Sequence, residues 1–74
     1  MITLAAQIAE AQRELALRRQ CYPGWIKRGK LDAGDAYYQI QAMEAIVRTL
    51  QRLDEAIDRT IGLEAATGPE EEER

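Results

Sequence analysis

Apolar residues recur at helical spacing in two stretches of unequal length, and a segment containing Pro23 and Gly24 separates these stretches. Within each stretch the apolar residues return every three or four positions, which places them on one side of an α-helix. Proline and glycine disfavour a continuous helix through the separating segment. The pattern therefore predicts an all-α chain built as an antiparallel two-helix hairpin.

The predicted hairpin occupies residues 1–62, with a helix over about 4–21, a bend over 22–31 and a second helix over about 33–61. Thr3 and Asp32 precede the two helices and carry side-chain oxygens suited to N-caps. Gly62 follows the second helix, where a glycine C-cap is common. In the bend, Pro23 and Gly24 suit a type II turn, and a single helical turn ending at Gly29 accounts for the segment equally well.

The remaining residues, 63–74, include a run of four Glu and few apolar side chains. Such a segment repels itself and has little to bury, so we predict a disordered acidic tail there.

Several classes of protein are excluded by residue types that the sequence lacks. The 74 residues contain no His, Ser or Asn and a single cysteine, Cys21. Catalytic triads in which histidine activates a serine or cysteine cannot be built from this set. Zinc sites of His and Cys ligands cannot be built from it either. There is also no glycine loop of the phosphate-binding type. We therefore expect a protein that is not an enzyme and that has no cofactor, no metal site and no internal disulfide.

The second predicted helix is longer than the first, and its apolar residues continue beyond the part that the first helix can cover. Two helices alone form a small core, and chains of this length are rarely stable without metal, disulfides or association. The hairpin is therefore predicted to assemble into a homo-oligomeric helical bundle, most simply a dimer with four helices. Its expected interface consists of Ile46, Leu50, Leu53, Ile57 and Ile61.

Positive charge is concentrated around the bend. Residues 18–30 include five basic side chains and no acidic one, although the whole chain carries a net charge of −3. Basic groups beside aromatic rings suit a ligand that combines phosphates with a flat base. Arg19 lies off the apolar side of its helix, so we expect it to be free for such a ligand. The candidate ligand-binding residues are Arg18, Arg19, Tyr22, Trp25, Lys27, Arg28, Lys30 and Tyr37. The alternative is structural, with the rings capping the open end of the core and the cations solvating its rim.

Other partners fit the sequence less well. The overall charge is acidic and the basic segment is small, which argues against duplex DNA. No apolar run approaches the roughly 20 residues needed to span a bilayer, and neither helix has the basic face of a membrane-surface helix. The start of the chain lacks the basic region of a signal peptide. These features, with the single cysteine, favour a cytoplasmic location.

Three parts of the chain resemble known proteins: residues 19–31 (Arg-Gln-Cys-Tyr-Pro-Gly-Trp-Ile-Lys-Arg-Gly-Lys-Leu), Ala36 and residues 43–50 (Met-Glu-Ala-Ile-Val-Arg-Thr-Leu). In these segments the chain resembles small helical-hairpin proteins encoded in the early regions of phages and prophages of proteobacteria. The resemblance covers about residues 4–53. It implies a phage accessory protein that acts in the host cytoplasm, with a role against host defence.

Two functions follow as expectations. In the first, the oligomer acts as a sponge that sequesters a small anionic nucleotide signal, such as a cyclic nucleotide or a cyclic ADP-ribose, at its basic and aromatic bend. In the second, a small oligomeric inhibitor binds a host protein through its helical face or its bend. Trp25 and Arg28 would then be the anchors, since Trp and Arg dominate interface energetics.

Overall fold

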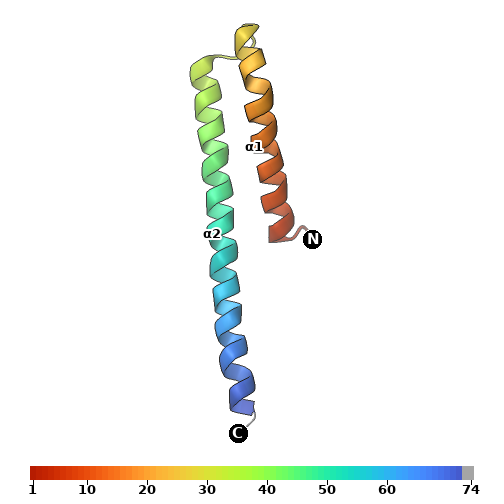
Figure 1. The fold of residues 1–74 in the computed structure, drawn as a ribbon, viewed down its shortest axis with the longest axis vertical. Coiled ribbons are helices and arrows are strands. Elements are labelled where there is room, and N and C mark those ends of the chain that lie inside the picture. The colour runs from red at the N-terminus through yellow and green to blue at the C-terminus, as the bar shows by residue number, and fades with distance from the viewer. Residues whose placement is uncertain (73–74) are drawn as a thin grey trace.

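The chain folds as a hairpin of two antiparallel α-helices. In the computed structural model, α1 spans Leu4–Lys27 and α2 spans Ala33–Glu72, and the two lie side by side from the connecting segment to the start of α1 (Figure 1). The structure describes the backbone of residues 1–72 and the side chains of residues 1–62. The predicted all-α hairpin is confirmed. The predicted acidic tail falls on residues 63–74, whose side chains lie outside the described part of the chain.

Both helices begin at the predicted N-caps. The Thr3 hydroxyl accepts a hydrogen bond of 3.1 Å from the amide of Ala6, and the Asp32 carboxylate accepts one of 3.1 Å from the amide of Asp35. Each bond satisfies an amide that has no partner within its own helix. These two residues therefore set where the helices start.

The first helix does not end at Cys21, and the expected turn at Pro23 is absent, because α1 continues to Lys27 with Pro23 inside it. Proline removes one hydrogen-bond donor and costs about 3 kcal/mol in a helix interior. The contacts of Arg18 and Tyr22 with Gln39 on α2, described below, lie just before Pro23 and help to offset that cost.

The end of α1 is a Schellman motif. Gly29 has a φ of 73°, its amide donates to the carbonyl of Ile26 at 3.0 Å, and the amide of Lys30 donates to the carbonyl of Trp25 at 2.8 Å. Glycine adopts this left-handed conformation without steric cost, so it commonly terminates helices. The backbone is therefore helical up to the approach to Gly29, but as a continuation of α1 and not as the separate helical turn that was the predicted alternative. The connection between the helices shortens to residues 28–32.

The core is a single row of side chains between the helices. Its buried members are Ala11, Leu15, Tyr22, Ala36, Met43 and Val47. Leu50, expected at an oligomer interface, packs instead against the buried cluster within its own chain. Its spacing of three residues from Val47 places it on the side of α2 that faces α1.

The two helices differ greatly in length, 24 residues for α1 against 40 for α2. The second helix does not end at the predicted glycine cap, since Gly62 lies within α2. The C-terminal part of α2 therefore extends beyond the start of α1 (Figure 1). Among the described residues, no helix is both long enough and apolar enough to cross a membrane.

Candidate functional site

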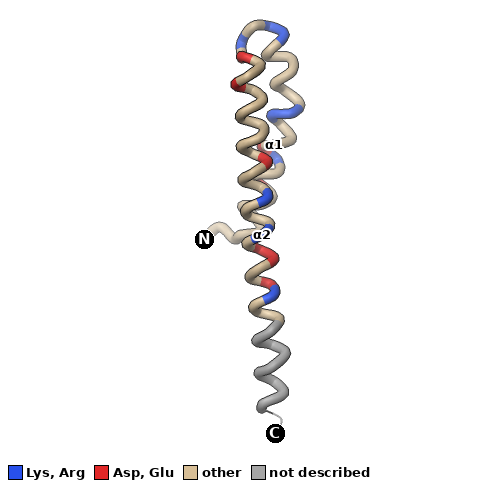
Figure 2. Tube along the Cα trace, turned by 90° about the vertical axis from the view of Figure 1, so that its left-hand side faces the viewer, with Lys and Arg blue, Asp and Glu red and all other residues tan. Residues whose placement is uncertain are grey.

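Three basic residues gather at the connecting end of the hairpin, and we call Lys27, Arg28 and Lys30 the basic tip. All three are exposed, and none forms an ion pair with another described side chain. Figure 2 shows these basic positions at the turn, with two acidic positions at the adjoining start of α2. Asp32 and Asp35 are those acidic residues, and they partly offset the positive charge.

The side chain of Arg28 folds back along α1. A Cβ placed on Gly24 would lie 3.4 Å from Nη1 of Arg28, so the guanidinium covers the glycine. The absence of a side chain at position 24 thus leaves room for Arg28 against the helix. This contact holds the guanidinium against the part of α1 that contains Gly24.

Arg18 and Tyr22, both predicted to bind a ligand, join the two helices instead. The Tyr22 hydroxyl donates to Oε1 of Gln39 at 2.8 Å, and Arg18 donates through Nη1 to the backbone carbonyl of Gln39 at 2.9 Å. Arg18 also donates through Nε to Glu14 at 3.1 Å. Tyr22 is buried, so its ring is unavailable to stack on a ligand.

Arg19 is also engaged, in an ion pair with Glu44 on α2. The prediction that Arg19 is free is therefore wrong. Its partner lies 25 residues away in the sequence, and the pairing depends on the register between the helices. Arg18 and Arg19 therefore lie on opposite sides of the line of contact between the helices. Their partners Gln39 and Glu44 are five positions apart on α2, so the two partners face different sides of that helix.

The two exposed aromatic residues of the predicted site lie on different sides of the hairpin. Trp25 packs on Tyr22, with ring centroids 5.5 Å apart, and belongs to the side marked by Gln39. Tyr37 is exposed and precedes Glu44 by seven residues, which places it on the side marked by Glu44. The two rings therefore do not form one stacking platform.

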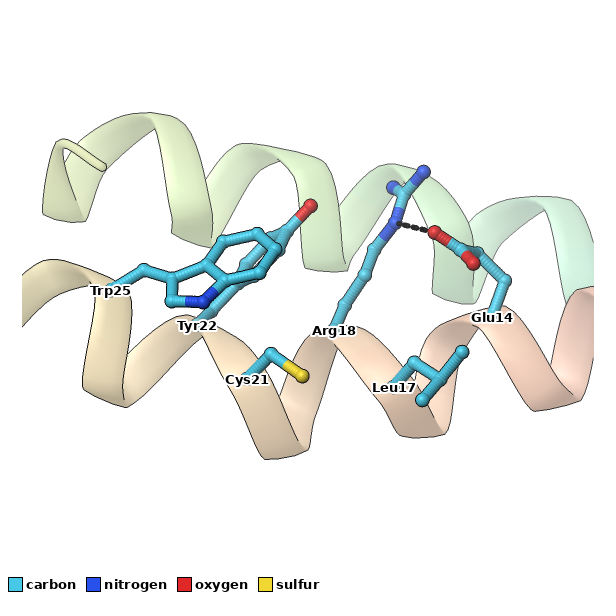
Figure 3. Close-up of a pocket in the computed structure, with 6 residues that line it drawn as sticks. All are labelled: Glu14, Leu17, Arg18, Cys21, Tyr22 and Trp25. Atoms are coloured by element: carbon cyan, nitrogen blue, oxygen red, sulfur yellow. Dashed lines mark hydrogen bonds and ion pairs between the residues drawn. The ribbon is translucent and has the colours of Figure 1, made fainter. Parts of the chain in front are cut away.

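A shallow groove of about 270 Å³ runs along the outer side of α1 (Figure 3). Trp25 and Tyr22 close one end of this α1 groove, Glu14 lies at the other end, and Cys21 and Leu17 form its outer edge. Trp25 and Leu17 are each about two-fifths exposed. The groove is thus an apolar surface that the hairpin itself leaves open.

Four of the five residues predicted at an oligomer interface remain exposed, namely Ile46, Leu53, Ile57 and Ile61, at 41–57%. Ile57 and Ile61 line a second hollow together with Ala56 and Thr60. The α1 groove was not predicted from the sequence. The signal that could have found it is the return of Leu17, Cys21 and Trp25 every four residues, on a side of the helix adjacent to the core.

Comparisons with known proteins add no relative: no family model matches the chain, and no curated protein or solved structure matches it significantly. The fold and the surfaces above therefore define the molecule by themselves, as a two-helix hairpin with a basic tip and an exposed apolar side.

Proposed function

We propose that the chain is a non-enzymatic binding protein that works as a homo-oligomer and captures a small anionic ligand of nucleotide type at its basic tip. The observation that carries this proposal is the cluster of three exposed cations without an ion-pair partner among the described side chains, Lys27, Arg28 and Lys30. Lys and Arg bind phosphate through charge-assisted hydrogen bonds. Trp25, at the adjoining end of the α1 groove, supplies an exposed ring against which a base can stack.

Self-association is the second part of the proposal, and it is supported by the exposed isoleucines of α2. Ile57 and Ile61 extend a row of apolar side chains past the region that α1 covers. Leaving such a row in water forfeits roughly 1.5–3 kcal/mol for each large side chain that a partner could bury. A two-helix core of this size gains the missing burial most directly from a second copy.

The oligomeric state is tested by light scattering on the purified chain. The double variant Ile57→Glu/Ile61→Glu should lower the mass to that of one chain. Arg59→Glu is the matched control because it changes the net charge by the same amount and lies on the opposite side of α2. An unchanged mass in the double variant would refute self-association through this part of the helix.

Ligand binding is tested by calorimetry against a panel of cyclic dinucleotides, cyclic trinucleotides and cyclic ADP-ribose isomers. Arg28→Glu should abolish the heat of binding, and added salt should weaken it because the tip is exposed and screened. Arg48→Glu provides the control, since Arg48 is an exposed arginine away from the tip. If no compound releases heat at high micromolar concentration, the nucleotide proposal fails.

A second candidate is an inhibitor that binds a host protein with an acidic surface. It is favoured by the exposure of both Trp25 and Arg28 near the connecting end of α1, because these two residue types dominate the energetics of interfaces. The resemblance to proteins of phage early regions supports either role as an accessory protein directed at the host. Purification from host lysate separates the two, since only the inhibitor captures one stoichiometric protein that is lost with Trp25→Ala.

A further inference from the structure

One side of the hairpin combines exposed apolar residues from both helices, and we call it the apolar face. The contact between Arg18 and Gln39 marks this side, and the α1 groove borders it. On α2, Ile46 and Leu53 follow Gln39 at intervals of seven residues, so they lie on the same side. The opposite side is marked by the ion pair between Arg19 and Glu44.

No charged residue interrupts the apolar face along α2. The residues of this face on α2 follow one another in alternating steps of three and four, which is the spacing of a coiled-coil interface. They are uncharged although 31% of the residues in the chain are charged. A second such row lies against α1 and forms the core. The uncharged row on the apolar face consists of Gln39, Ala42, Ile46, Thr49, Leu53, Ala56 and Thr60.

We infer that the occupant of this face is a second copy of the chain, bound antiparallel about a two-fold axis at Thr49. This inference rests on the self-association proposed above and specifies its geometry. The row is symmetric about its centre, since an axis there sets Ile46 against Leu53 of the second copy and Ala42 against Ala56 of the second copy. An isologous dimer requires such a self-complementary surface.

Charge complementarity favours the antiparallel direction. Residues 18–30 carry five basic side chains and no acidic one, whereas the sequence after Ile61 carries five Glu and one Arg. A parallel dimer would bring like-charged ends together. An antiparallel dimer brings the basic end of each hairpin toward the acidic end of the other, and it separates the two basic tips.

The same register explains why α2 extends beyond α1. Cys21 lies at the level of Gln39, because its neighbours Arg18 and Tyr22 both bond to that residue. The two-fold axis brings the extension of α2 from the second copy to this level, with Ile61 near Cys21 and Ile57 near Leu17. The extension would thus cover the edge of the α1 groove formed by Leu17 and Cys21 and complete a three-helix arrangement at each end of the dimer.

Native Cys21 allows a direct test of this register. Within one chain, Ile61 lies 22 residues beyond Gln39, about 33 Å along α2, so a disulfide between positions 21 and 61 cannot form inside a hairpin. Under mild oxidation with oxidised glutathione, we expect Ile61→Cys to give a disulfide-linked dimer. The link should be absent from the unmodified protein and should vanish in Cys21→Ser/Ile61→Cys, because it needs both cysteines. Arg59→Cys, on the opposite side of α2, should not link to Cys21.

The other outcomes overturn the inference in distinguishable ways. A disulfide that persists in Cys21→Ser/Ile61→Cys joins position 61 to itself and indicates a parallel dimer. A dimeric mass by light scattering without any disulfide disproves this register and leaves self-association standing. If light scattering gives the mass of one chain for the unmodified protein, both this register and self-association itself are refuted. Helical circular dichroism on each variant verifies that the exposed substitution leaves the fold intact.

Discussion

The hydroxyl of Tyr22 on α1 donates a 2.8 Å hydrogen bond to Oε1 of Gln39 on α2. Tyr22 directly precedes Pro23 within α1. This bond connects the two helices where the local sequence favours a break in α1. It also converts a residue expected to meet a ligand into part of the core. Tyr22 therefore helps to hold α1 against α2 next to Pro23.

Removing this hydroxyl should measurably weaken the fold. Tyr22→Phe keeps the buried ring and loses one hydrogen bond, so we expect the free energy of unfolding to fall by about 1 kcal/mol. Tyr37→Phe is the control, because Tyr37 is exposed and should change nothing. Urea titration followed by circular dichroism provides the measurement. Equal effects for the two variants would contradict the role given to the Tyr22 bond.

The two adjacent arginines should differ in their contributions. Arg18 bonds both Glu14 and the carbonyl of Gln39 with its side chain largely buried, whereas Arg19 forms one more exposed ion pair with Glu44. We expect Arg18→Ala to cost about 1–3 kcal/mol and Arg19→Ala less than about 1 kcal/mol. Thermal unfolding of the two variants at low and high salt tests the order. A larger loss for Arg19→Ala would show that the exposed pair matters more.

Two glycines should respond to alanine in opposite directions. Gly29 has a positive φ of 73°, so Gly29→Ala should destabilise the hairpin by about 1 kcal/mol. Gly62 lies inside α2 with open space around it, and Gly62→Ala should stabilise the chain by up to about 1 kcal/mol. The sign of each change is read from the unfolding midpoint. If Gly62→Ala destabilised the chain, Gly62 would be the end of the helix after all.

One surface pair provides a test of pH dependence. A hydrogen bond from Arg13, together with its charge, lowers the pKa of Glu10 below its ordinary value. A lowered pKa means that the pair stabilises the fold above the ordinary carboxyl range and that this contribution is lost as the pH falls through the lowered value. An NMR titration of the Glu10 carboxyl should show the shift, and Arg13→Ala should return the pKa to normal. A Glu10 pKa that stays low in Arg13→Ala would exclude this cause.

The helix starts could be predicted from the sequence because capping is a local interaction. Thr3 and Asp32 each bond an amide three residues ahead, and no distant part of the chain is involved. The end of α1 could not be predicted in this way. Local preference placed a break at Pro23, but contacts to Gln39 from across the seam outweigh it.

The candidate site shows the same division. The exposure of Lys27, Arg28 and Lys30 follows from their place at the end of a helix and in a short connection, which the sequence indicates. The loss of Arg19 to Glu44 follows from the register between two helices, which no local pattern encodes. The separation of Trp25 from Tyr37 has the same origin, since each residue's side of the hairpin depends on how its helix is rotated against the other.

The unequal helices also determine how the molecule moves through solution. The chain measures 69 × 21 × 16 Å and has a radius of gyration of 19.3 Å. A compact domain of this length has a radius of gyration of about 11 Å. Such a rod experiences far more friction than a sphere of equal mass, so even a single chain elutes from a sizing column ahead of compact proteins of its weight. Its tumbling is anisotropic as well. In NMR experiments, nuclei in bonds parallel to the long axis therefore relax at rates different from those in bonds perpendicular to it.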